Sequence, residues 1–411
     1  MVNIVDARES TGTNVVANAR LAAGLNQIIR CGSTDVLSKL VTANSRGLIT
    51  GTSTGGVMDT AILQRAGLLL DLRSPSERHE GRAQRWMSSP VTHNSWQHIS
   101  TDKYDNNYGI NQAVATVVAY EVSPDKKYSE AELQRILDQN SPRVVVRLDI
   151  LSPMRFMEYL EQNWWSTTEK HHADLLRKGT NMLERQRQEK LHTMRIQTLN
   201  SRGLLGLNEA ILETGQQGLC TALQLITIFM ERMAKEEEER RAKNQQYTSD
   251  SSQLHDLIVV HCVQGKDRTG LLVMLCQAII GLSQEEIVHD YHRSHDILLK
   301  RRNRRTKQRI DSKQGVSSAA MQRVAATTQS HHHQTSTVAV TAAKWDPSIF
   351  LGAPEEIMKC TLELLNTRYG SVAPGYLDHI GFGAVWRKRF QQAQKTKPRH
   401  LGRAFAASSK L

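Results

Sequence analysis

The sequence predicts an α/β protein with a mainly parallel sheet flanked by helices and an extra helical segment. The run Leu257–Val260 is short, apolar and rich in β-branched residues, which is typical of a strand buried on both faces. The apolar stretch over residues 269–281 directly after it predicts a buried helix that a glycine ends. Further strand signals lie at residues 67–72 and at Val144–Val146. Together these patterns favour the α/β class.

Capping residues mark the ends of several expected helices. Ser129–Glu132 forms a capping box that opens a helix through residue 137, and Ser283–Glu286 forms a second one that opens a helix to residue 299. A final helix is expected over residues 354–370, between a proline and a glycine.

The extra helical segment is expected in the middle of the chain. Residues 153–195 show a helical and strongly charged pattern, with Trp164-Trp165 as an apolar anchor. One long helix is expected from about Asn208 to Arg241, with an apolar first half and a solvated, glutamate-rich end.

The composition along the chain predicts one domain with two tails. Residues 1–17 are interpreted as a flexible tail, residues 18–390 as the single domain and residues 391–411 as a basic tail. Residues 311–343 are rich in Ser, Thr, Ala, Gln and His without periodicity, which predicts a disordered insertion. The three adjacent histidines at 331–333 lie inside it and are interpreted as low complexity rather than as a metal site.

The loop between the strand at 257–260 and the following helix carries the most chemistry. Cys262 and Arg268 stand at the two ends of seven residues. A loop of this length can turn successive backbone N–H groups inward at the positive end of a helix dipole, which suits a phosphate group. The same field favours a thiolate at Cys262, and Arg268 offers a planar fork for two phosphate oxygens. The loop residues expected to bind the substrate are Val263, Gln264, Gly265, Lys266 and Thr269.

Two further details of the loop fit this chemistry. Gly265 allows the backbone to approach the phosphate, and Thr269 is a candidate to donate its hydroxyl to the sulfur when a phosphocysteine is hydrolysed. A nucleotide-binding P-loop is excluded, because Lys266 is followed by Asp267 rather than by Ser or Thr.

This loop resembles that of the atypical tyrosine and lipid phosphatases related to the secreted mycobacterial tyrosine phosphatase B. The resemblance is scattered over roughly residues 18–385, and the loop is its most specific part. It implies a cysteine-phosphatase fold, a single phosphatase domain, and hydrolysis of phosphate monoesters through a phosphocysteine at Cys262, without metal or cofactor. The other similar segments are Ile29–Ser33, Asp71–Arg78, Asp290-Tyr291, Tyr369–Val372 and Tyr376-Leu377.

The chain also departs from the family pattern. The family's opening Asn-Phe-Arg-Asp-Leu-Gly-Gly stands here as Asn18–Gly24, without the aspartate and one glycine, which puts the N-terminal contribution to the site in doubt. The middle, about residues 85–200, matches no family segment, and substrate choice is expected to depend on it.

Two aspartates are candidates for the general acid. The resemblance assigns the protonation of the leaving oxygen to Asp267, and no Trp-Pro-Asp acid loop occurs in the sequence. Asp71 is the rival, because the carboxyl ends of strands line the ligand crevice in open α/β sheets. Arg73 beside it is a further accessory candidate. The alternatives are that Asp267 only pairs with Arg268 or an amide, and that Asp71 is a turn residue in a charge cluster.

The loop leaves the substrate class open. Protein phosphotyrosine is expected first, with dual specificity included. Lys266 adds a second cation, which by resemblance is linked to a phosphoinositide or inositol phosphate; a lysine solvated at a loop tip is the alternative. An inactive phosphate-binding module is the alternative from another class, but such a module is expected to lack Cys262 or Arg268.

The composition describes a globular protein with an excess of positive charge. The chain has 411 residues, of which 39% are hydrophobic and 23% charged, and a formal net charge of +12. Basic clusters at residues 300–309 and 387–399 are interpreted either as solvated helix ends or as a contact for an anionic membrane surface, and a nucleic acid partner is not expected.

The cysteines and apolar runs bear on the compartment. Five cysteines, an odd number without metal-like spacing, argue for a reducing compartment. The first nine residues lack the apolar core of a secretory signal, and no apolar run approaches membrane-spanning length. A cytoplasmic enzyme is therefore expected.

Overall fold

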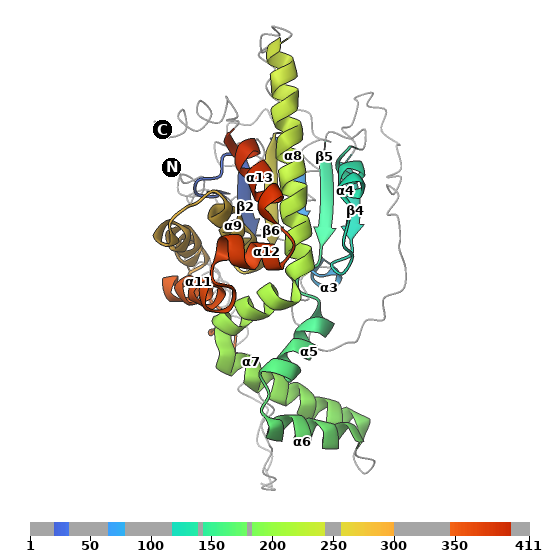
Figure 1. The fold of residues 1–411 in the computed structure, drawn as a ribbon. Coiled ribbons are helices and arrows are strands. Elements are labelled where there is room, and N and C mark those ends of the chain that lie inside the picture. The colour runs from blue at the N-terminus through green and yellow to red at the C-terminus, as the bar shows by residue number, and fades with distance from the viewer. Residues whose placement is uncertain are drawn as a thin grey trace, which may run out of the picture.

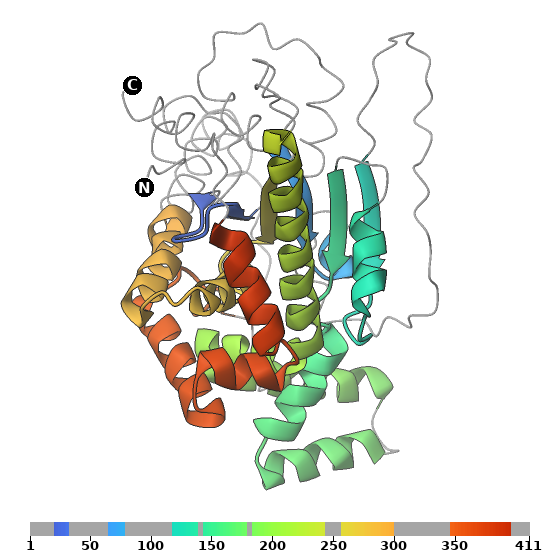
Figure 2. The same cartoon turned by 45° about the horizontal axis from the view of Figure 1, so that its top comes forward.

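A mixed, mostly parallel sheet forms the centre of the protein (Figures 1 and 2). The computed structural model describes residues 20–32, 65–78, 117–138, 143–178, 183–242, 256–299 and 346–395. Within these residues six strands pair in the order β1-β2-β6-β3-β5-β4, and all neighbours are parallel except β1 and β2. The strands are β1 (Arg20–Leu21), β2 (Ile28–Gly32), β3 (Ala66–Asp71), β4 (Val117–Val122), β5 (Arg143–Leu148) and β6 (Leu257–Cys262).

Helices flank this sheet and extend beyond it, so the expected α/β class is confirmed (Figure 1). A further helix covers residues 284–299, and residues 372–376 form one π-helical turn, η3 (Val372–Tyr376). The other helices are α3 (Pro75–Arg78), α4 (Glu130–Leu137), α5 (Pro153–Asn163), α6 (Thr167–Lys178), α7 (Glu184–Thr214), α8 (Gln216–Ala242), α9 (Arg268–Ile279), α11 (Glu355–Tyr369), α12 (Leu377–His379) and α13 (Ala384–Lys395).

The inner strands are apolar because both of their faces are covered. Every residue of β3 and of β6 is buried, and the side chains of Leu68, Leu70 and Val260 have no exposed surface. A continuous apolar run is what a parallel strand between two helical layers requires. The strands expected at residues 67–72, 144–146 and 257–260 are therefore confirmed.

An arginine ties together three helices on one face of the sheet. Arg389 of α13 donates to Glu231 of α8 at 2.8 Å and to Glu130 of α4 at 2.9 Å. Its neighbour Arg387 pairs with Asp378. The basic tail expected from residue 391 is corrected, because α13 continues to Lys395 and is buried at 393–394. The division into domain and tails otherwise stays a prediction.

The extra helical segment lies beyond the carboxyl ends of the strands, where α5, α6 and α7 extend away from the sheet (Figure 1). The predicted anchor is confirmed, because both tryptophans are buried. The indole nitrogen of Trp165 donates to Thr198 Oγ1 of α7 at 3.0 Å. Trp164 packs edge-on against Phe156 of α5, with the ring centroids 6.1 Å apart.

The single long helix expected from Asn208 to Arg241 is wrong. The chain turns at Gly215, between α7 and α8. A Cβ at this position would lie 2.5 Å from the carbonyl oxygen of Ile150, so the turn needs a glycine where two backbones meet. Helical periodicity continues across the turn because both helices face the same core.

Both expected capping boxes and the expected glycine end of the helix after Pro354 agree with the structure. Ser129 and Glu132 form the reciprocal capping box, and Ser283 and Glu286 exchange the same two bonds at 2.9 and 3.2 Å. Helix α11 ends at Gly370 in a left-handed conformation with φ of 80°. It is not the final helix, because α12 and α13 follow it.

Several expectations fall on parts of the chain outside the described residues. These are the tail at 1–17, the basic cluster at 300–309, the insertion at 311–343 and the histidines at 331–333. None of the helices within the described ranges is long and apolar enough to cross a membrane.

Candidate active site

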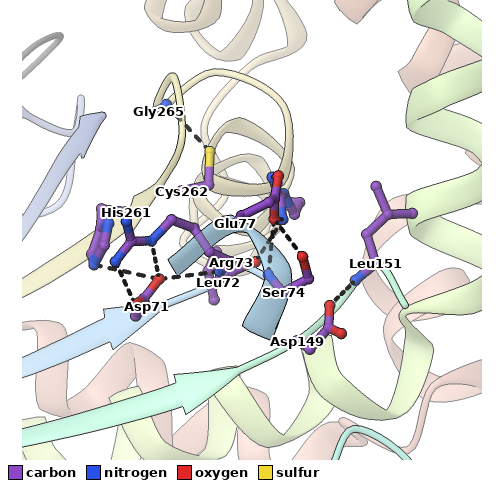
Figure 3. A network of polar contacts seen from close by, with 11 residues as sticks. Asp71, Leu72, Arg73, Ser74, Glu77, Asp149, Leu151, His261, Cys262 and Gly265 are labelled. Atoms are coloured by element: carbon purple, nitrogen blue, oxygen red, sulfur yellow. Dashed lines mark hydrogen bonds and ion pairs between the residues drawn. The ribbon is translucent and has the colours of Figure 1, made fainter. Parts of the chain in front are cut away.

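The candidate site lies where the carboxyl ends of β6, β3 and β5 meet (Figure 3). Cys262 is the last residue of β6 and Arg268 is the first residue of α9, so the loop between them wraps the amino end of that helix. The Cys262 side chain is only 2% exposed, and the backbone N–H of Gly265 donates to its Sγ at 3.2 Å. At least one amide of the loop therefore points at the sulfur, as expected of a phosphate cradle.

Two glycines let the loop lie directly against the end of β2. Gly265 has a φ of 71°, and a Cβ there would lie 2.4 Å from the carbonyl carbon of Cys31. A Cβ on Gly32 would lie 2.2 Å from the carbonyl carbon of Gln264. Real Cβ atoms do not approach backbone so closely. The loop therefore packs backbone to backbone against β2, without room for a side chain on either glycine.

Arg268 is held end-on by a carboxylate. Its Nη1 and Nη2 donate to the two oxygens of Glu77 at 2.5 and 2.6 Å, and Nη1 also donates to the Leu72 carbonyl oxygen at 3.1 Å. Among the described residues, these contacts occupy three of the five N–H groups of a guanidinium. The N–H groups on Nε and on the far side of Nη2 share one edge, which is a bidentate fork for two phosphate oxygens.

The charges of this pair support each other despite their burial. Burial alone would lower the pKa of the Arg268 guanidinium, but the negative charges of Glu77, Cys262 and Asp149 raise that pKa. Burial alone would raise the pKa of Glu77, but the charge and hydrogen bonds of Arg268 and the bonds from Ser74 lower it. Both groups are therefore held in their charged forms.

Glu77 was missed by the sequence analysis, although its spacing contains a signal. Ser74 donates to the Glu77 carboxylate from its backbone N–H at 2.8 Å and from its hydroxyl at 3.1 Å. Pro75 opens α3 between them. A serine followed three residues later by glutamate is the spacing of a capping box. This spacing could have located a carboxylate with a fixed orientation beside the carboxyl end of β3.

Lys266 and Asp267 pair with each other. The Lys266 Nζ lies 2.7 Å from Asp267 Oδ1, and the Lys266 side chain is only 1% exposed. The alternative of a solvated lysine at a loop tip is therefore wrong, and so is the pairing of Asp267 with Arg268, which takes Glu77 instead. The role of Asp267 as general acid stays a prediction.

The remaining loop residues differ in exposure. Gln264 is exposed at the tip of the loop and Val263 is half-buried. The Thr269 hydroxyl is buried and makes no hydrogen bond within the described part of the chain. Its donation to the sulfur during hydrolysis of a phosphocysteine stays a prediction.

Asp71 forms an ion pair with Arg73, two residues further along the chain (Figure 3). Its two oxygens accept from Arg73 Nε and Nη2 at 2.8 Å each, and His261 Nε2 lies 3.6 Å from Oδ1. Asp71 and Arg73 are both buried. This arrangement favours the interpretation of Asp71 as a turn residue that fixes the segment after β3. Arg73 is directed to Asp71, and its accessory role stays a prediction.

A third aspartate lies at the same edge. Asp149 follows β5 directly, is half-buried, and accepts from the Leu151 N–H at 3.1 Å (Figure 3). Its charge contributes to the raised pKa of Arg268. The rule applied to Asp71, that strand ends line the crevice, would also have found Asp149. No group of three or more His, Cys, Asp or Glu residues placed to hold a metal ion occurs among the residues described.

A comparison with known proteins shows that the loop lies within a region of the chain that matches a protein family. A profile described as the tyrosine phosphatase family matches residues 162–393. The triple specificity protein phosphatase PtpB of Mycobacterium tuberculosis (strain ATCC 25618 / H37Rv) is 30% identical over 134 residues. This stretch is 33% of the present chain and 42% of that protein, so the match spans less than half of the relative's length.

The pair between Glu77 and Arg268 predicts a pH-dependent stability. Removing one partner of a buried pair costs about 3–5 kcal/mol, and we expect Glu77→Gln to lower the free energy of unfolding at pH 7 by the lower end of that range. Because folded Glu77 has a lowered pKa, its contribution is complete above the ordinary value of 4.5 and is lost as the pH falls through the lowered value. The difference from wild type in urea unfolding should therefore shrink as the pH is lowered below 4.5.

The matched control for this variant is Glu231→Gln, which breaks a more exposed pair with Arg389 away from the loop. Exposed pairs contribute about 0–1 kcal/mol, so the free energy of unfolding of this variant should stay close to that of wild type, both at pH 7 and at acidic pH. A Glu77→Gln variant as stable as the control would contradict the structural role given to Glu77.

Proposed function

The chain belongs to the tyrosine phosphatase family, and from this premise we propose that it hydrolyses phosphate monoesters through a phosphocysteine on Cys262. Protein phosphotyrosine is the substrate class proposed first, with other phosphorylated side chains included. One observation carries the proposal: the Cys262 sulfur, an inward backbone N–H and the fork of Arg268 converge at the amino end of α9.

The proposed reaction has two steps that restore the enzyme. The Cys262 thiolate attacks phosphorus, the S–P bond forms, and the bond to the leaving oxygen breaks while an aspartic acid protonates that oxygen. Water then attacks phosphorus and gives its proton to the same carboxylate. The S–P bond breaks, and inorganic phosphate leaves. Arg268 and the loop amides stabilise the charge on the equatorial oxygens in both steps.

Asp267 is the acid proposed first, and its contact with Lys266 places a condition on that role. A substrate phosphate would compete with Asp267 for the Lys266 ammonium, which lies 2.7 Å from the Asp267 carboxylate. When the phosphate draws the ammonium to itself, the Asp267 carboxyl is released toward the leaving oxygen. Asp149 is the second candidate, because it is half-buried at the same edge and its charge acts on Arg268.

A phosphoinositide is the second substrate class, and the burial of Lys266 favours it. A lysine held inside the loop supplies a cation next to the bound phosphate, where a neighbouring phosphate on an inositol ring would meet it. The M. tuberculosis relative is named a triple specificity phosphatase, and we propose a similarly broad choice of substrate for this chain. Contact with an anionic membrane surface is proposed for the basic cluster at residues 300–309 first. In the second cluster, 387–399, two of the arginines, Arg387 and Arg389, already pair with acidic side chains.

The nucleophile gives the first test of the proposed function. Cys262→Ser should abolish hydrolysis of p-nitrophenyl phosphate, because a serine oxygen is a poor nucleophile at its own pKa. The variant should still bind a phosphotyrosyl peptide in calorimetry, since the amide cradle remains. Cys360→Ser, at a half-buried free cysteine in α11, is the control and should keep activity. Turnover by the Cys262 variant beyond a trace would exclude the covalent mechanism.

A pair of substrates identifies the acid. Asp267→Asn should slow phenyl phosphate hydrolysis by about 10²- to 10⁴-fold, the usual contribution of general acid catalysis, but should slow p-nitrophenyl phosphate much less. The nitrophenolate leaves without a proton, which explains the difference. Asp71→Asn and Asp149→Asn should affect both substrates alike. A selective loss in either of these variants would move the acid to that residue.

The second cation gives a test of substrate class. Lys266→Ala should reduce phosphoinositide turnover about tenfold more than phosphotyrosine turnover, the size of one charge-assisted hydrogen bond. Lys235→Ala, an exposed position on α8 outside both basic clusters, is the control and should change neither. Equal losses on both substrates in the Lys266 variant would remove the argument for a phosphoinositide.

A further inference from the structure

A buried arginine supports the phosphate loop from behind. Arg30 of β2 donates from Nη2 to the carbonyl oxygen of Gly265 at 3.0 Å and from Nη1 to Asp290 Oδ2 at 2.9 Å. The Arg30 side chain is 1% exposed and that of Asp290 is fully buried. Arg30 and Gly32 are paired in register with Val260 and Cys262. The Arg30 side chain therefore lies on the same face of the sheet as the Cys262 side chain.

Asp290 contacts a second buried arginine. Arg20 of β1 also contacts this residue, with Nη2 donating to the Asp290 carbonyl oxygen at 2.5 Å and to Ser294 Oγ at 3.1 Å. Burial alone would raise the pKa of Asp290, but the charges of Arg30 and Arg20 lower it. Two buried guanidinium groups thus share one carboxylate. Arg30 contacts Asp290 through Nη1 only, and its Nη2 donates to the Gly265 carbonyl oxygen of the loop.

That carbonyl controls the direction of a loop amide. The peptide unit is planar and trans, so the Gly265 C=O and the Lys266 N–H point in opposite directions. When Arg30 holds the oxygen on the outer side of the loop, the Lys266 N–H is turned to the inner side, where the phosphate is proposed to bind. Gly265 has a φ of 71° and no side chain, so its own conformation resists a rotation of this peptide only weakly.

We propose that Arg30 is a positioning residue, which fixes the Gly265–Lys266 peptide so that the Lys266 N–H is aimed at the bound phosphate. The inference rests on the proposed function, since a phosphate must occupy the loop. A rotated peptide would direct a carbonyl oxygen at the anion instead, which repels it. Arg30 thus acts on the reaction through the backbone and does not touch the substrate.

The two arginines offer a matched pair of variants. Arg30→Met and Arg20→Met each remove one buried guanidinium, and each leaves Asp290 with one arginine partner. Both variants should lower the melting temperature by similar amounts. Only Arg30→Met removes the contact to Gly265, so only this variant should weaken inhibition by orthovanadate, by at least about tenfold, with a parallel fall in kcat/KM for p-nitrophenyl phosphate.

Two further measurements keep the test decisive. Arg30→Lys keeps a positive charge beside Asp290, but an ammonium cannot contact Asp290 and the Gly265 carbonyl together as the planar guanidinium does. This variant should therefore lose as much vanadate affinity as Arg30→Met, while its melting temperature stays close to that of wild type. Hydrogen exchange at residues 263–268, measured by mass spectrometry without substrate, should be faster in Arg30→Met than in Arg20→Met.

The outcomes separate this inference from the proposed function. Equal vanadate affinities in Arg30→Met and Arg20→Met, or equal exchange in the loop, overturn the positioning role while wild-type activity stands. A wild-type protein without phosphatase activity overturns the proposed function. The exchange comparison needs no turnover and still decides whether Arg30 fixes the loop.

Discussion

The ion pair between Arg268 and Glu77 joins the amino end of α9 to α3, the short helix after β3, and the rest of the site depends on this connection. An arginine that is free to move loses side-chain entropy each time it binds a phosphate. A second contact that already fixes the guanidinium removes this cost from substrate binding. Glu77 holds the end of the guanidinium and is itself held by Ser74. The fork is therefore oriented before any substrate arrives.

Three cations around the loop, Lys266, Arg30 and Arg268, each pair with a carboxylate. Lys266 pairs with Asp267 at 2.7 Å and Arg30 with Asp290 at 2.9 Å, as Arg268 pairs with Glu77. A buried charge without a partner is costly, so the buried cations of a phosphate site need carboxylate partners of their own. A phosphate can share these paired cations when it binds. The pairing also sets the direction in which each cation points.

The site combines parts of the chain inside and outside the family match. The matched range, residues 162–393, contains the loop, α9 and Asp290. Arg30 comes from β2 and Glu77 from α3, and both elements precede the matched range. The backbone packing of Gly32 against Gln264 shows how closely the two parts fit. A substitution in the first part can therefore alter the geometry of the matched loop.

The sequence by itself determined the features that depend on neighbours along the chain. Cys262 and Arg268 are the two ends of a seven-residue segment in a strand-loop-helix context, and the capping box of Ser129 is also local, so both could be predicted. The break at Gly215 was missed because helical periodicity continues across it. Only the tertiary structure decided the charge partners: Glu77 is 191 residues from Arg268, and Arg30 is 260 residues from Asp290. An apolar strand pattern identifies a strand but not its neighbours in the sheet, and the order of the strands decides which distant charges meet.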